Sequence, residues 1–103
     1  MKKKKYAWFE VQNEAHRPIE TLYEEDHGFE LYLQKGIYHY PSGITEIGYR
    51  FIRRRPDGKL QYARNQACIP SPGMAQELID EAKKAGWASD LSPEERYGKE
   101  GSK

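Results

Sequence analysis

The sequence predicts an α+β domain in which a curved antiparallel β-meander of three to four strands is followed by one C-terminal amphipathic helix. Three observations carry this prediction. Residues 29–54 alternate apolar and polar side chains with a period of two, interrupted by turn residues at positions 40–43. A Pro-Asp-Gly turn at residues 56–58 joins two further strand candidates. Apolar residues then recur at helical spacing between residues 72 and 85, behind a Ser-Pro start.

Length and composition limit the chain to one small domain. It has 103 residues, 37% hydrophobic and 32% charged, and its aromatic content of 13% is too high for general disorder. We therefore expect a single α+β domain over residues 6–88, a disordered basic start over residues 1–5, and a mostly disordered tail over residues 89–103. The net charge of +1 gives no strong overall field, so attraction to a charged ligand must come from local patches.

Cysteine usage and hydropathy indicate a cytoplasmic protein with no membrane partner. Cys68 is the single cysteine, which excludes an intramolecular disulfide and any cysteine-based metal site. We expect it to be buried as a small hydrophobe near a strand end. No apolar run approaches the roughly 20 residues of a membrane helix, and residues 2–10 do not resemble a signal-peptide core.

The N-terminal quarter gives the weakest structural signal. Residues 6–11 form an aromatic-rich strand candidate, which residues 16–18 interrupt with a proline. Residues 19–23 fit either a brief strand or a turn of helix, and the acidic residues after them fit a loop. The sequence leaves open the structure of residues 12–28, and whether the first strand pairs within its own chain or across a dimer.

The two strands flanking residues 40–43 have well-separated faces. The first runs from residue 29 to residue 40, with Gly36 at a bulge or bend, and the second starts at residue 44. The alternation predicts a core face and a face that one helix leaves uncovered. The core face carries Phe29, Leu31, Leu33, Ile47, Tyr49 and Phe51; the other carries Glu30, Tyr32, Gln34, Arg50, Ile52 and Arg54.

Cap signals define the C-terminal elements. A third strand spans residues 60–69, and Ser71 then caps a helix that runs to about Ala85. Gly86 is placed for a left-handed cap, and Trp87 can fold back onto the last turn. Residues 92–95 repeat the cap-and-proline pattern and predict at most one helical turn, with residues 98–103 disordered.

An arginine-rich stretch is the main functional candidate. Five arginines lie near tyrosines on two candidate strands, and interleaved guanidinium and aromatic groups bind phosphates and stack bases of single-stranded nucleic acid. The same residues also fit a structural role, in which they keep a strand face soluble, protect a sheet edge and stack on cross-strand tyrosines. The arginines are Arg50, Arg53, Arg54, Arg55 and Arg64.

A family resemblance favours the nucleic-acid interpretation. The span from Arg50 to Ile79, about a third of the chain, has a Pro-Asp-Gly-Lys-Leu turn at residues 56–60, an Ala-Arg pair at residues 63–64 and a Ser-Pro helix start at residues 71–72. It resembles the single-stranded-DNA-binding transcriptional coactivator domain, the family of the eukaryotic positive cofactor and its bacterial relatives. Arg50 and Arg64 fall on strand arginines of that family.

The resemblance is stronger in the fold than in the binding residues. Arg53 stands where the family shows an aromatic residue, Gln61 and Asn65 stand where it shows lysines, and Gln66 replaces a glycine. The resemblance implies a homodimer that binds separated strands in curved channels without base-specific readout, and a role associated with transcription.

No other motif predicts chemistry. The three histidines lie on separate segments without metal-ligand or acid-base spacing, and the acidic residues 24–26 lack calcium-loop spacing. We expect no cofactor, no metal and no enzymatic activity. Three large aromatic residues fit core or interface anchors: Trp8, Phe9 and Trp87. The histidines are His16, His27 and His39.

The expectation is therefore a non-enzymatic, homodimeric protein that binds single-stranded DNA or RNA. The alternative is a small protein–protein interaction module that uses the uncovered sheet face and Trp8. The expected nucleic-acid contacts are Arg50 and Arg64, followed by Arg53, Arg54, Tyr62 and Lys59.

Overall fold

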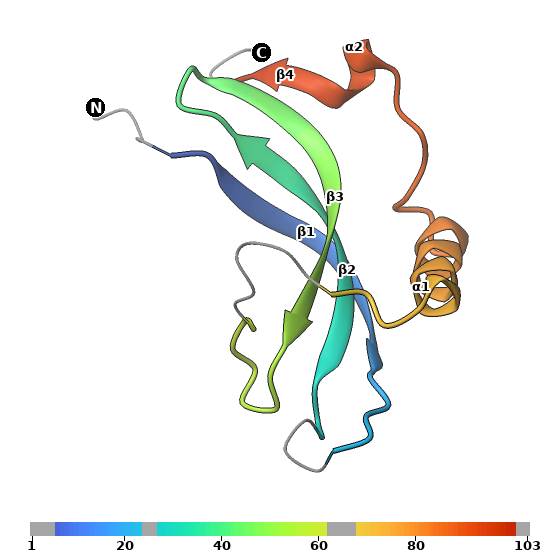
Figure 1. Cartoon of the computed structure of the whole chain (residues 1–103). Helices are drawn as coiled ribbons and strands as arrows, with labels where there is room; N and C mark the ends of the chain where they lie inside the picture. The colour runs from blue at the N-terminus through green and yellow to red at the C-terminus, as the bar shows by residue number, and fades with distance from the viewer. Residues whose placement is uncertain (1–5, 24–26, 62–67, 101–103) are drawn as a thin grey trace.

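The computed structural model describes residues 6–23, 27–61 and 68–100, which form a four-stranded antiparallel sheet and two helices (Figure 1). The strand order is β1-β2-β3-β4, so each strand pairs with its neighbour in sequence order. The predicted α+β meander with a helix after it is confirmed. The elements are β1 (Trp8–Pro18), β2 (Glu30–His39), β3 (Ile44–Arg54), α1 (Pro72–Lys84), α2 (Pro93–Arg96) and β4 (Tyr97–Lys99).

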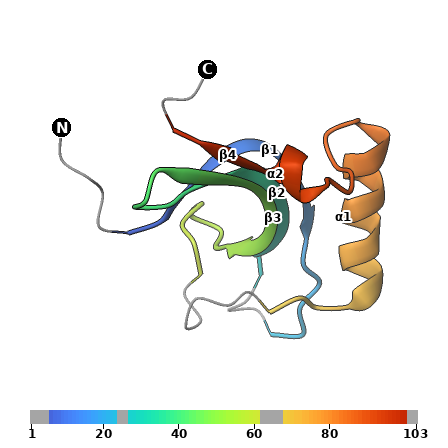
Figure 2. The ribbon, with the colours of Figure 1, turned by 90° about the horizontal axis from the view of Figure 1, so that it is seen from above.

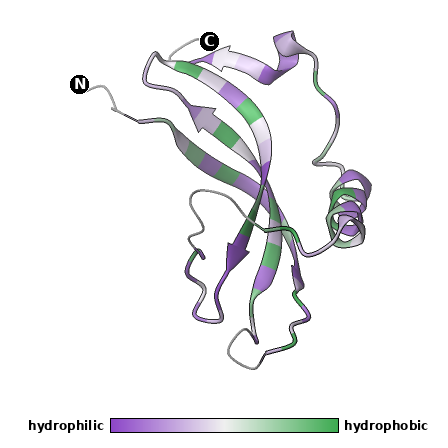
Figure 3. Ribbon diagram, viewed as in Figure 1, coloured by the Kyte–Doolittle hydropathy of each residue, from purple (hydrophilic) through white to green (hydrophobic). Residues whose placement is uncertain are grey.

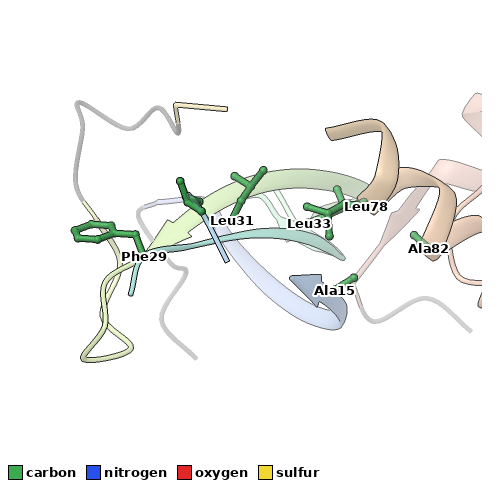
Figure 4. Packing of buried hydrophobic residues seen from close by; sticks show 7 residues of the cluster. Ala15, Phe29, Leu31, Leu33, Leu78 and Ala82 are labelled. Carbon is green, nitrogen blue, oxygen red and sulfur yellow. The ribbon is translucent and has the colours of Figure 1, made fainter. Parts of the chain in front are cut away.

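The sheet is curved, and α1 covers only one of its faces. Seen from above, the strands bend around the opposite face, while α1 lies outside the curve (Figure 2). The core lies between α1 and the β1–β2 part of the sheet, and Leu31 and Leu78 are fully buried in it (Figure 4). The buried apolar residues are Ala15, Ile19, Phe29, Leu31, Leu33, Leu78 and Ala82.

Both predicted hairpin turns are confirmed. Gly43 has a φ of +90°, and its N–H donates to Tyr40 O at 2.9 Å. Gly58 has a φ of +83° and donates to Arg55 O at 2.8 Å. Glycine suits both turns because a φ in this range is strained for residues with a Cβ.

The chain begins to pair with β3 after the second turn. Leu60 forms an isolated bridge with Arg54, and the Gln61 N–H donates to Arg53 O at 2.9 Å. The remainder of the predicted third strand falls on residues 62–67, outside the described residues.

The helix caps follow the sequence signals. Ser71 Oγ accepts the Met74 N–H at 3.1 Å, and Gly86 follows the helix with a φ of +86°. The Trp87 N–H then donates to Ala82 O at 3.1 Å, as the predicted fold-back requires. Ser92 begins the short α2 with a capping box, whose backbone and side-chain hydrogen bonds lower the pKa of Glu95.

Strand β1 is longer than expected, and the predicted interruption at residues 16–18 is wrong. These residues pair with residues 30–32 of β2, because β1 lies at a sheet edge where a terminal proline interrupts no ladder. The register shifts between Val11 and Asn13, which marks a β-bulge. Residues 19–23 form neither strand nor helix, although the Ile19 N–H donates to Phe29 O. The first strand pairs within its own chain.

Two further expectations at the C-terminal side are wrong. Residues 93–96 form α2, the single helical turn that the sequence predicts, but residues 97–99 form β4 where a mostly disordered tail is expected. Pairing of β4 with residues 44–46 of β3 supplies backbone partners that local sequence does not reveal. Cys68 is exposed, not buried as expected, and residues 68–71 ahead of α1 belong to no strand.

The hydrophilic end of β3 stands out from the more apolar α1-facing core (Figure 3). Arg53 and Arg54 end this strand. Within residues 6–23, 27–61 and 68–100, no helix combines the length and apolar content needed to cross a bilayer.

Candidate nucleic-acid interface

The candidate site lies on the sheet face opposite α1, which we call the uncovered face. Side chains alternate along a strand, so residues that flank Leu31 and Leu33 in β2 point away from the helix. Antiparallel pairing then aligns their partners in β1 and β3 on the same face. The uncovered face comprises Phe9, Glu14, His16, Glu30, Tyr32, Gln34, Tyr38, Glu46, Arg50, Ile52 and Arg54.

A buried amide holds Arg50 at the centre of this face. Gln34 is fully buried, and its Oε1 accepts the Arg50 Nε–H at 2.9 Å. Gln34 Nε2 donates to Glu14 Oε2 at 2.8 Å. Because an ionised carboxylate only accepts hydrogen bonds, Glu14 turns the amide oxygen of Gln34 toward Arg50. The three strands thus position one guanidinium through two hydrogen bonds.

An aromatic ring supports the same guanidinium. Arg50 Cζ lies 4.2 Å from the centroid of the Phe9 ring, within cation–π range. Phe9 passes over Gly36, where an added Cβ would collide with the ring and with the Glu10 carbonyl. The predicted irregularity at Gly36 lies instead in β1, where the register shifts between Val11 and Asn13 opposite Gly36 and Lys35. Glycine is needed at position 36 because only glycine leaves room for Phe9.

A second arginine and ring lie further along the same face. Arg54 Cζ is 5.2 Å from the centroid of the Tyr32 ring, and its Nη1 donates to Gly58 O at 3.0 Å. The Tyr32 ring stacks on His16 with centroids 4.7 Å apart, and His16 Nδ1 lies 2.5 Å from Glu30 Oε1. Tyr32 thus has an aromatic neighbour and a cationic one.

The two arginines carry charge that no carboxylate neutralises directly. Partial burial lowers the pKa of Arg50; the nearby charge of Arg54 lowers it further, while Tyr38 opposes the change. Among the described residues, neither Arg50 nor Arg54 forms an ion pair with a carboxylate. A bound anion would relieve this repulsion and accept the remaining guanidinium N–H groups.

Acidic groups restrict where an anion fits. Glu14 lies beside Gln34 on the same face and accepts its amide hydrogen, and Glu30 bonds to His16. Glu46 accepts the Tyr40 hydroxyl and pairs with Arg96 at 3.4 Å. The face is therefore not a uniformly basic groove. Its positive charge is concentrated at the two guanidinium groups, which suits individual phosphates rather than a broad polyanionic surface.

The structure brings together only some of the expected contacts. Arg50 and Arg54 share the uncovered face, whereas Arg53 pairs with Leu31 on the other face and donates to Cys68 O at 3.3 Å. Lys59 is exposed in the hairpin turn. Tyr62 and Arg64 lie outside the described residues.

Gln34, Glu14 and Phe9 were missed as site residues. Gln34 was expected on this face, but the strand pattern gave no sign that it is buried. Its link to Glu14 depends on a register across a bulge, which no local pattern reveals. In the part of the chain that the structure describes, no group of three histidine, cysteine or acidic side chains is arranged to hold a metal.

Comparison with known proteins identified no relative of this chain. No protein-family model, no curated protein and no solved structure matches this chain.

Proposed function

We propose that this protein binds single-stranded nucleic acid on the uncovered face and performs no catalysis there. One observation carries the proposal: two guanidinium groups share a curved face and each lies over an aromatic ring. Within residues 6–23, 27–61 and 68–100, neither is paired with a carboxylate. This combination of cation and ring matches the two parts of a nucleotide, its phosphate and its base.

The binding mode follows from the arrangement of these groups. Arg50 is held by Gln34 and Phe9, so it loses little side-chain freedom when it contacts a phosphate. Unpaired bases stack on exposed parts of the Tyr32 and His16 pair, and such stacking tolerates any sequence. A duplex hides its base faces, and we therefore propose single strands as the ligand.

From the family resemblance, we propose that the protein is a homodimer with a role associated with transcription. We also propose that it is located in the cytoplasm. A reducing compartment suits an exposed single cysteine, Cys68. The alternative is a protein-interaction module on the uncovered face. The acidic groups Glu14, Glu30 and Glu46 favour it, because their charge weakens the attraction to a polyanion.

A fluorescence-anisotropy titration with a labelled oligo-dT tests the binding. We expect saturable binding at about 50 mM salt that weakens at about 200 mM, because phosphate contacts release counterions. The matching duplex should bind more weakly. Absence of detectable affinity at the lower salt would refute the nucleic-acid proposal and favour the protein-interaction module.

Light scattering on the same samples measures the mass with and without oligonucleotide. A mass of twice 12.0 kDa supports the homodimer. A monomer that still binds oligo-dT would remove the dimer from the proposal and leave the binding face intact.

A further inference from the structure

One histidine side chain links the segment after β4 to β1 and β2, in addition to the backbone pairing of β4 with β3. His39 ends β2, and its two ring nitrogens face carboxylates from different segments. Nε2 lies 2.8 Å from Glu10 Oε1 on β1, and Nδ1 lies 2.6 Å from Glu100 Oε1, just after β4. The two carboxylates and the imidazole together link three parts of the chain.

This arrangement requires a particular protonation state. A neutral imidazole has one N–H and one bare nitrogen, so it donates to only one carboxylate. The bare nitrogen then faces the lone pairs of the other carboxylate. The doubly protonated imidazolium donates to both and neutralises part of their charge, so the observed geometry fits this form.

The surroundings of the ring maintain these contacts. Trp8 stacks on His39 with centroids 4.3 Å apart and planes 12° from parallel. The His39 side chain is 15% exposed, so water replaces its lost partners less readily than at an open surface. Among the described residues, Glu10 from β1 and Glu100 from the C-terminal segment are the charged groups shown to act on the ring.

The two carboxylates differ in how strongly the backbone holds them. Glu10 lies within β1, which pairs with β2 on both sides of the bulge between Val11 and Asn13. Glu100 follows a three-residue strand, and its N–H donates to Gly43 O at 2.6 Å. Loss of the bond to His39 would therefore weaken the Glu100 end first.

We propose that His39 is a pH-sensitive latch whose protonated ring holds β4 and Glu100 against the sheet, and whose deprotonation loosens them. Opening exposes the β3 edge at residues 44–46, which β4 otherwise occupies. The inference concerns the end of the sheet near β4 and does not depend on nucleic-acid binding.

The direction of the pH effect follows from linkage. Burial lowers the pKa of His39, but hydrogen bonds and charge from Glu10 and Glu100 outweigh it and raise the pKa above the ordinary 6.5. A raised pKa means that the folded state binds the proton more tightly than the unfolded state. The stabilisation is complete below pH 6.5 and is lost as pH rises through the raised value.

Hydrogen exchange at the Glu100 amide tests the latch. We expect its protection factor, corrected for the intrinsic exchange rate, to fall about fivefold from about pH 6 to about pH 9 in the wild-type chain. The Ile19 amide, which donates to Phe29 O at the other end of the sheet, should keep its protection. The midpoint of an NMR titration of the His39 ring should equal the midpoint of the fall in the Glu100 protection factor.

Variants separate the latch from general pH effects. His39→Gln should remove the pH dependence, whereas the matched His16→Gln, which breaks a histidine–glutamate pair away from β4, should retain it. In Glu100→Gln the side-chain amide can donate a hydrogen bond to the neutral His39 ring or accept one from it. The pH dependence of the protection factor at position 100 should therefore also disappear. Constant protection in the wild-type chain, or a pH dependence that persists in His39→Gln or Glu100→Gln, would overturn the proposal.

Discussion

Arg50→Glu is expected to lower the affinity for oligo-dT about a hundredfold while the chain remains folded. Hydrogen bonds to charged groups contribute roughly 1.5–3 kcal/mol each, and the new carboxylate would also repel the phosphate that Arg50 binds. The slope of log affinity against log salt should become shallower by about 0.7, as one phosphate contact is lost. Anisotropy titrations at several salt concentrations measure both quantities.

Arg55→Glu is the matched control because it changes the net charge equally. Arg55 lies exposed in the hairpin turn and pairs with Asp57 at 3.5 Å, away from the Phe9 ring and Gln34. Its substitution should have a much smaller effect on affinity. Arg50→Gln removes the charge without adding a repulsive one, and circular dichroism checks that each variant is folded. Equal losses in Arg50→Glu and Arg55→Glu would argue against a specific site at Arg50.

Leu78→Ala is expected to destabilise the domain by about 3 kcal/mol, since removal of a buried leucine side chain loses its transfer free energy and leaves a cavity. Leu78 is fully buried where α1 meets the sheet. For a chain of this length, such a loss lowers the melting temperature by roughly 10–20 °C. Thermal and urea unfolding followed by circular dichroism measure the change.

Leu22→Ala provides the same substitution at a position that is 87% exposed. It should change the free energy of unfolding by less than about 0.5 kcal/mol. If the two variants were equally stable, the contact between α1 and the sheet would not be the core of the domain.

Elements fixed by neighbouring residues were predictable from the sequence. Gly43 and Gly58 sit in turns that need a positive φ, and Ser71 and Gly86 mark the ends of α1 by the hydrogen bonds that they make or permit. The alternation around Leu31 and Leu33 placed the core face of β2 correctly. Each of these signals acts over a few residues, and therefore a single sequence reveals it.

Elements fixed by distant partners were not predictable. The second half of β1 is polar and ends in Pro18, but hydrogen bonds to β2 hold it in the sheet. The three residues of β4 have little strand character of their own and are placed by their pairing with β3. His39 gave no signal because Glu10 and Glu100 are remote from it in sequence.

The candidate site shows the same division. Arg50, Arg54 and Tyr32 could be assigned to one face from strand periodicity alone. The support of Arg50 by Phe9 depends on a close approach at Gly36, and the role of Gln34 depends on the pairing of three strands. The sequence therefore identified the charged groups of the site. The residues that hold Arg50 in place could be identified only from the register of β1, β2 and β3.

The long sequence separation between β4 and its partner β3 has a consequence for the order of folding. Strands β1, β2 and β3 follow one another, so their ladders form from contacts that are close in sequence. By contrast, the pairing of Ile44 with Lys99 closes a loop of more than 50 residues that contains both helices. Long-range pairing is slow because the entropy of loop closure opposes it. During synthesis, we expect the meander to assemble first and the edge of β3 to stay open until residues 97–99 have emerged from the ribosome.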